Sequence, residues 1–152
     1  MKDHPSIRQA VDSDWPAIRD CIRQSFDVYV SRIGREPAPM RTDYRDAIAS
    51  GNVFVMDGAD ACVNCVLIIV PERDHLLIDT IAVAPALQHQ GIGRVLMAYA
   101  EQRAAALGFT ELRLYTNVKM TENQRWYPRI GYHETHREFE NGYERVFYSK
   151  HI

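Results

Sequence analysis

The stretch LIDTIAVAPALQHQGIGRVL, residues 77–96, decides the fold of this chain of 152 residues. Its first part, LIDTIAV, is an apolar run typical of a strand, and Pro85 marks the end of that strand. Gly91 and Gly93 then come directly before a helical repeat of apolar residues. The sequence therefore predicts a strand, a glycine turn and a helix in immediate succession.

The turn QHQGIG, residues 88–93, is suited to bind a phosphate group. Glycines let a backbone approach a ligand closely, and the first amides of a helix point outward with the positive end of the helix dipole behind them. The turn lacks the ending of a nucleotide P-loop, and Leu96 stands where a dinucleotide-binding motif has its third glycine. The alternative interpretation is a glycine turn that only starts a helix.

Outward from this stretch, the periodicity predicts an α/β fold with a mixed sheet, in the order strand, two helices, three strands, helix, strand, helix and two strands. Glycine and two prolines predict a loop between residues 31 and 42. The predicted strands are 6–11, 53–57, 62–70, 75–83, 111–117, 132–140 and 143–149, and the predicted helices are 15–26, 43–50, 92–107 and 121–130.

Three local signals predict details of the second half of the chain. Asn141 and Gly142 form the strongest short signal for a hairpin. Thr121 with Gln124 predicts a capping box at the start of a short helix. Pro128 removes one hydrogen bond of that helix and predicts a kink or an early end.

Composition and charge exclude several classes of protein. Lysine and arginine total 18 against 20 aspartate and glutamate, so the net charge is −2, and the pI of 6.3 argues against binding to nucleic acid or to an anionic membrane. The longest apolar run, residues 65–71, is far shorter than the roughly 20 residues of a membrane helix. Residues 1–15 carry acids and a proline where a signal peptide would have an apolar stretch, so we expect no signal peptide there. We expect one globular domain over residues 1–152 in the cytoplasm.

The cysteines and histidines do not predict a metal site. Cys62 and Cys65 lie three apart in a predicted strand, so they point to opposite faces, and no second pair follows. His133 and His136 have the same spacing in HETH, without an obvious third ligand. We expect no metal cofactor.

The stretch 77–96 resembles the acyl-CoA-binding motif of the GNAT superfamily of N-acetyltransferases, which has a hydrophobic strand, a proline and then Q/R-x-x-G-x-G/A. Gln88, Gly91 and Gly93 occupy its defining positions. YPRIGY, residues 127–132, resembles the second signature of that superfamily. The resemblance implies the family's mixed, mostly antiparallel sheet of about six or seven strands, flanked by about four helices.

The resemblance also implies acetyl-CoA as a co-substrate. Its pyrophosphate is expected on the amides of Gln88, His89, Gln90, Gly91, Ile92 and Gly93, with an amide or charge added by Arg94. The pantetheine arm is expected along Ile81, Ala82 and Val83, bonded to the main chain at Ile81 and Val83 like an added strand. Asn123 matches a family asparagine that contacts the cofactor; its other interpretation is a helix cap.

Tyr127 is implied as the general acid that protonates the departing thiolate of coenzyme A. A phenol has a pKa of about 10 and a thiol of about 8.5, so the phenol is protonated and able to donate at neutral pH. Tyr127 is alternatively part of an apolar helix face with Trp126 and Ile130.

A general base must take a proton from the attacking amine. Asp79 shares a strand face with Ile81 and Val83, and it is either this base or an ordinary strand acid. Further candidates are Glu134, Tyr29 and Asp27.

The implied reaction is transfer of an acetyl group from acetyl-CoA to a primary amine by direct attack in a ternary complex. A non-catalytic acyl-CoA-binding module, another acyl donor and a hydroxyl acceptor stay open as alternatives. In the family the acceptor, a small molecule or a peptide amine, is bound by segments that correspond to residues 26–44 and 134–143. Their charged and tyrosine residues are of mixed sign and leave the acceptor open: Tyr29, Arg32, Arg35, Glu36, Arg41, Asp43 and Glu138. A homodimer also stays open.

Overall fold

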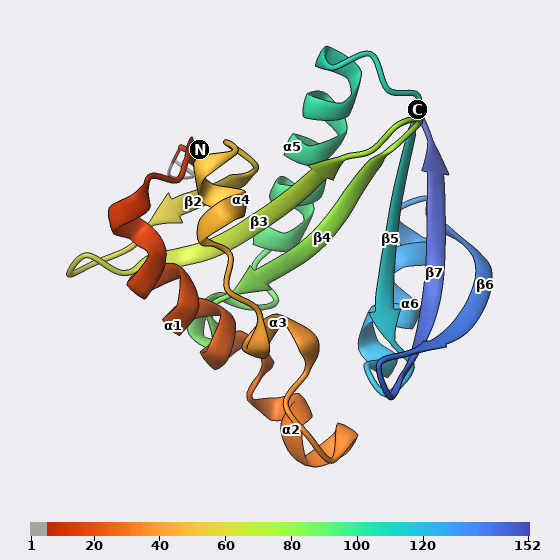
Figure 1. Cartoon of the computed structure of the whole chain (residues 1–152), viewed down its shortest axis with the longest axis horizontal. Helices are drawn as coiled ribbons and strands as arrows, with labels where there is room; N and C mark the ends of the chain where they lie inside the picture. Colours follow the sequence, from red (N-terminus) through yellow and green to blue (C-terminus); the bar gives the residue numbers. More distant parts are fainter. Residues whose placement is uncertain (1–5) are drawn as a thin grey trace. The chain divides into compact units, whose positions relative to one another are not determined.

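The computed structural model describes residues 6–152 and contains seven strands in one mixed sheet (Figure 1). The strand order is β1-β2-β3-β4-β5-β7-β6. β4 pairs with β5 in parallel, whereas β1–β2, β2–β3, β5–β7 and β6–β7 are antiparallel, which confirms the predicted fold class. The strands are β1 (Arg8–Gln9), β2 (Val53–Asp57), β3 (Val63–Pro71), β4 (Leu76–Val83), β5 (Glu111–Asn117), β6 (His133–Glu140) and β7 (Tyr143–His151).

The described residues form six α-helices, two more than predicted. They are α1 (Trp15–Phe26), α2 (Val28–Ile33), α3 (Ala38–Arg41), α4 (Arg45–Ala49), α5 (Ile92–Ala106) and α6 (Thr121–Arg129), with 3₁₀ turns at Asp12–Asp14 and Pro85–Leu87. The prediction of a loop between residues 31 and 42 was wrong in two places, because the chain there forms the last turn of α2 and all of α3. One of the two prolines that suggested a loop, Pro39, stands in the first turn of α3, where the missing N–H costs nothing.

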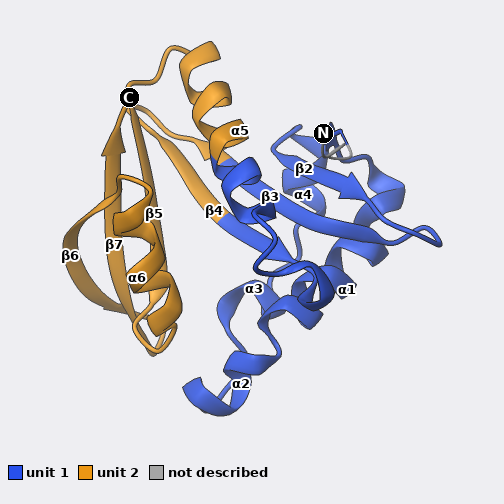
Figure 2. Ribbon diagram, turned by 180° about the vertical axis from the view of Figure 1, so that it is seen from behind, with its two compact units in different colours: residues 1–69, 80–97 blue, residues 70–79, 98–152 orange. Residues whose placement is uncertain are grey.

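Two compact units divide the described chain (Figure 2). The first contains residues 6–69 and Thr80–Met97, and the second contains Val70–Asp79 and Ala98–Ile152. β4 and α5 each supply residues to both units. The assignment of residues 1–152 to a single domain therefore stays a prediction.

The core of the first unit follows the predicted periodicity. Ile18, Ile22 and Phe26 recur on one side of α1 and are buried. β3 is buried at every position from Cys65 to Ile69, as expected of a strand with both faces covered. No helix within residues 6–152 is long and apolar enough to cross a membrane.

In the second unit, β5 alternates in burial, and α6 lies against only one of its faces. The buried residues of β5 are Leu112, Leu114 and Thr116. Thr116 is contacted by Asn123 on α6 and by Met120 directly before that helix. The opposite face of β5 therefore has no contact with α6.

One arginine ties the edge of the sheet to the start of α1. The Arg8 guanidinium donates to Asp14 at 2.8 Å and to Asp57 at 2.8 Å, and the Asp14 carboxylate also accepts the Val11 amide at 2.7 Å. Hydrogen bonds from Arg8 lower the pKa of Asp14 and of Asp57.

Replacing Arg8 with glutamine should lower the free energy of unfolding by about 1 kcal/mol at neutral pH, because the ion pairs are partly exposed. A carboxylate with a depressed pKa stabilises the fold fully above its ordinary pKa and loses this contribution as the pH falls through the depressed value, so the difference should shrink as the pH falls below about 4. Urea unfolding at pH 7 and pH 3 measures both effects. Arg19→Gln is the control, because Arg19 is exposed and its contact with Asp20 is 3.8 Å long. An equal loss of stability in Arg8→Gln at both pH values would contradict the prediction.

Candidate active site

The turn between β4 and α5 has an unusual backbone. His89 and Gly91 are both left-handed, at φ 65° and 83°, on either side of Gln90. Left-handed residues within a turn align successive N–H groups around a concave anion site. Helix α5 begins at Ile92, and its first backbone bond runs from the Val95 amide to the Gly91 carbonyl at 3.2 Å.

The surroundings of Gly91 fit an anionic ligand. A Cβ built on Gly91 meets nothing within 4 Å, so any side chain there would fill space next to the start of α5. His89, Gln90 and Arg94 are exposed around the same turn. The amides at a helix start together with this open space can hold a phosphate or pyrophosphate group.

Two side chains hold Val83, the last residue of β4. The Gln88 Nε2 donates to the Val83 carbonyl at 3.1 Å, and the Val83 amide donates to the Ser25 hydroxyl at 3.3 Å. The main-chain groups of Val83 that were expected to bond pantetheine therefore already have partners within the first unit. Ile81 and Val83 are half-buried, while Ala82 between them is buried.

The sequence interpretation missed Ser25. It is buried on α1 one turn from Ile22, so it is a polar residue within the apolar stripe of that helix. Such a residue needs a hydrogen-bond partner, and this is the signal that could have revealed its contact with β4.

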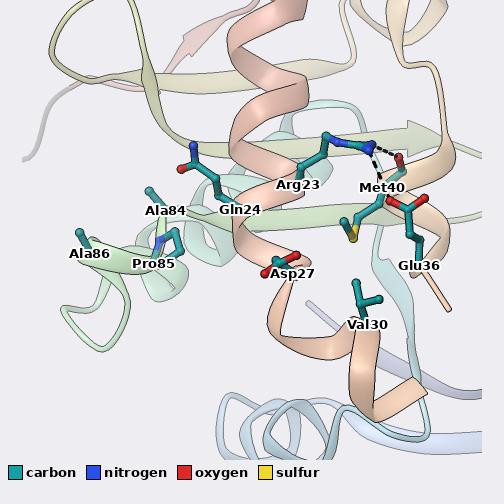
Figure 3. Close-up of a pocket in the computed structure, with 9 residues that line it drawn as sticks. All are labelled: Arg23, Gln24, Asp27, Val30, Glu36, Met40, Ala84, Pro85 and Ala86. Atoms are coloured by element: carbon teal, nitrogen blue, oxygen red, sulfur yellow. Dashed lines mark hydrogen bonds and ion pairs between the residues drawn. The ribbon is translucent and has the colours of Figure 1, made fainter. Parts of the chain in front are cut away.

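An open pocket of about 700 Å³ lies beside the end of β4 (Figure 3). Arg23 spans one wall, donating to the Met40 carbonyl at 3.2 Å and to Glu36 at 3.4 Å. The segment 26–44, expected to bind the acceptor, supplies about half of the lining. The pocket is lined by Arg23, Gln24, Asp27, Val30, Glu36, Met40, Ala84, Pro85 and Ala86.

In the second unit, Tyr127 is buried within a cluster of aromatic rings. Its ring centroid lies 5.2 Å from that of Trp126, 6.1 Å from that of Tyr132 and 5.5 Å from that of Tyr148. Burial of the ring agrees with the packing interpretation, and it also fixes the direction of the hydroxyl, as a general acid requires.

The motif YPRIGY holds Tyr127 by ending α6. The Tyr132 amide donates to the Tyr127 carbonyl at 3.0 Å and the Gly131 amide to the Pro128 carbonyl at 3.2 Å, with Gly131 at φ 97°. These bonds form a Schellman motif, which includes an apolar contact between Tyr127 and Tyr132. The helix continues through Pro128 and ends only after Arg129.

Lys150 closes the same helix end from β7. Its Nζ donates to the Ile130 carbonyl at 2.9 Å and pairs with Glu101 at 2.5 Å. The ammonium also lies 5.5 Å from the centre of the Tyr132 ring. A cation at the C-terminus of a helix is favoured by the helix dipole, so these contacts stabilise α6 next to Tyr127.

The capping box predicted at Thr121 and Gln124 was wrong. Met120 is the N-cap residue of α6 without a side-chain bond, and Gln124 donates instead to the Val118 carbonyl at 2.6 Å. Asn123 is not a cap either, since its Nδ2 donates to the Thr116 hydroxyl at 3.1 Å.

The base candidates have different surroundings. Asp79 is half-buried on β4 in the second unit. Glu134 is exposed and pairs with Arg137 at 3.2 Å. Asp27 lines the pocket in the first unit, and Tyr29 lies under the Arg32 guanidinium at 5.0 Å.

Burial raises the pKa of Cys21 to about 12 and that of Cys65 to about 11, so both thiols are protonated at neutral pH. His136 stacks on Phe147 at 4.3 Å. Within residues 6–152, no three histidine, cysteine, aspartate or glutamate side chains are grouped to hold a metal ion.

Sequence comparison identifies relatives of this chain. A family model described as an acetyltransferase (GNAT) domain matches residues 49–134, which is more than half of the chain. The aminoalkylphosphonate N-acetyltransferase of Salmonella typhimurium is 37% identical over 62 residues. That alignment spans 41% of this chain and 40% of the relative's length.

Solved structures share the fold. The PaiA N-acetyltransferase of Thermoplasma acidophilum, in complex with coenzyme A, has a TM-score of 0.80 at 17% identity, with 97% of this chain and 98% of that chain covered. The N-acetylglutamate synthase of Neisseria gonorrhoeae, complexed with coenzyme A and N-acetyl-glutamate, has a TM-score of 0.76 at 19% identity, over 100% of this chain and 36% of that chain. From the family match and the shared fold, we conclude that this chain belongs to the GNAT acetyltransferase family.

Proposed function

We propose that this protein transfers an acetyl group from acetyl-CoA to a primary amine by direct attack in a ternary complex. The observation that carries the proposal is the turn before α5, where His89 and Gly91 are left-handed and a Cβ on Gly91 would fill open space. Membership of the GNAT acetyltransferase family supports the same cofactor. Coenzyme A is bound by the similar PaiA protein.

The chain's own groups divide the binding between backbone and side chains. The amides of residues 88–94 would hold the pyrophosphate at the positive end of α5. Ile81 would bond the pantetheine arm through its main chain, while Ser25 and Gln88 keep Val83 in place. Acetyl-CoA, when bound, supplies an activated thioester carbonyl.

Two side chains would move the protons. Asp79, whose carboxylate oxygens can accept a proton, would act as the base toward the attacking amine. Tyr127 would donate its phenolic proton to the leaving thiolate of coenzyme A. Because the ordinary pKa of a thiol is about 8.5, the protonated thiol is the more stable form at neutral pH. The aromatic cluster and the Schellman motif would hold the Tyr127 hydroxyl in one direction.

Two similar proteins guide the choice of acceptors to test. The curated relative acts, by its name, on aminoalkylphosphonates, and the similar synthase was solved with N-acetyl-glutamate. Amines with an acidic group therefore belong in the first acceptor screen, together with polyamines, aminoglycosides and peptide amines. Release of coenzyme A with any amine, and transfer of the acetyl group to its nitrogen, would support the proposal.

Replacing Gly91 with valine should weaken acetyl-CoA binding by at least about tenfold, because the side chain would fill the space that the pyrophosphate needs and break charge-assisted hydrogen bonds. Isothermal calorimetry measures the affinity. Gly108→Val is a matched control, since Gly108 is also left-handed, at φ 85°, with nothing within 4 Å of a built Cβ. Undiminished binding by the Gly91 variant would overturn the phosphate site.

Replacing Tyr127 with phenylalanine should lower kcat by about 100-fold or more, as loss of a general acid does, with acetyl-CoA affinity nearly unchanged. Steady-state kinetics with the best acceptor and calorimetry separate the two effects. A variant that retains the wild-type rate would show that Tyr127 has a packing role alone, and a protein that binds acetyl-CoA without turnover on any acceptor would fit the binding-module alternative.

Tyr132→Phe is the control for this experiment and a prediction in itself. The Tyr132 hydroxyl is buried and has no hydrogen-bond partner in the described part of the chain. Its removal should leave kcat unchanged and raise the melting temperature slightly or not at all, because an unsatisfied buried hydroxyl is destabilising. A fall in kcat similar to that of Tyr127→Phe would mean that the aromatic cluster, and not the Tyr127 proton, sets the rate.

A further inference from the structure

The second unit has a sheet face that α6 does not contact, and a buried arginine lies on it. Arg145 on β7 pairs in register with Asn117 on β5, and Phe147 pairs with Tyr115, so Tyr115 and Arg145 share this face. Arg145 is only 8% exposed, although arginine is rarely buried unless it is paired.

Two tyrosine rings and one carboxylate hold the Arg145 guanidinium. Its central carbon lies 4.7 Å from the centre of the Tyr115 ring and 5.6 Å from that of Tyr143. Its Nη1 donates to Glu140 Oε2 at 2.5 Å. The rings fix the plane of the guanidinium by cation–π contact, so its N–H groups have fixed directions.

Glu140 is a replaceable partner. Its side chain is 42% exposed, and it stands directly before the hairpin turn at Asn141 and Gly142, whose φ angles are 51° and 82°. A guanidinium has five N–H donors in a fork, and the hydrogen bond to Glu140 uses one of them. A carboxylate or phosphonate from solution can therefore bind Arg145 beside Glu140 or in its place.

Tyr115 interacts with both this arginine and Asp79. The register of β4 and β5 pairs Leu77 with Arg113, which places Asp79 on the same face as Tyr115. Burial raises the pKa of Tyr115 most; the Asp79 carboxylate raises it further, and the Arg145 guanidinium lowers it. The Tyr115 hydroxyl is thus within the field of both charges.

We propose that Arg145, held by Tyr115 and Tyr143, binds the anionic group of a small acceptor amine whose amino group lies toward Asp79. This inference rests on the proposed function and names its substrate class: amines that carry a carboxylate or a phosphonate. An ammonium group is attracted by Asp79 and an anionic group by Arg145, whereas a second cationic group would meet the guanidinium at close range. Acceptors with an anionic tail are therefore preferred.

The test uses four acceptors of similar length that differ in the charge of the tail: β-alanine, 2-aminoethylphosphonate, propylamine and 1,3-diaminopropane. The wild-type protein should acetylate the first two with the highest kcat/KM, and the ratio between them identifies carboxylate or phosphonate as the natural group. Arg145→Gln should lower the preference for the anionic acceptors over propylamine by at least about tenfold, since a charge-assisted hydrogen bond is lost. Activity with propylamine, which has no anionic tail, should fall far less.

Two further variants separate recognition from folding. Glu140→Gln removes the competing carboxylate and should lower KM for the anionic acceptors, which a purely structural Glu140 would not do. Arg113→Gln is the matched control, because Arg113 on β5 also pairs with a glutamate, Glu111, but is exposed; it should leave activity with all four acceptors unchanged. Thermal melting of each variant shows whether it is folded.

Equal loss of activity toward all four acceptors in folded Arg145→Gln, or a wild-type preference for propylamine or 1,3-diaminopropane, would overturn the inference and leave the proposed function intact. Calorimetry of β-alanine and propylamine binding to the protein with coenzyme A gives an independent readout. Tighter binding of β-alanine that depends on Arg145, without turnover of any acceptor, would support the subsite and overturn the proposed function. Absence of β-alanine and 2-aminoethylphosphonate binding would overturn the subsite.

Discussion

The first amides of α5 cannot be satisfied within their own helix, and the proposed cofactor site depends on this constraint. Within the described residues, neither of the two glutamines of the turn caps these amides. Gln88 donates backward to the Val83 carbonyl, and Gln90 donates backward to the Ala86 carbonyl. Both bonds tighten the turn that follows β4, and the left-handed Gly91 leaves space above the helix start. The same residues that shape the turn thus keep it suited to an external anion.

The fold could be predicted closely wherever the hydrophobic period was long. The strands from β2 to β7 and the helices α1, α5 and α6 were all found, because alternation and helical stripes directly reflect which faces are buried. The short helix α3 was missed, since a four-residue helix has too little periodicity to outweigh its proline. The capping box failed for another reason: Gln124 found a better acceptor in Val118, which only the three-dimensional path of the chain brings close.

Site residues could be predicted from sequence only where a continuous motif contains them. The turn before α5 and Tyr127 both lie in such motifs, although their roles are still to be tested. Ser25, Tyr115 and Arg145 lie in no motif, and strand register or tertiary packing brings each to its partners. Arg145 and Asp79 lie far apart in the sequence, and β5 separates their strands in the sheet. No local spacing pattern could therefore relate these two residues.

The net charge of −2 is compatible with binding an anionic cofactor and an anionic acceptor. Neutral amides can bind a pyrophosphate, so a polyanionic cofactor needs no excess of lysine or arginine. Arg145 is balanced by Glu140, and Arg23 in the pocket is balanced by Glu36, so neither cation appears in the net charge. Selectivity for an anionic acceptor would then arise when a carboxylate or phosphonate of the acceptor replaces the Glu140 carboxylate on a fixed guanidinium. Such an exchange depends on the relative fit of the two anions and not on the total charge of the protein.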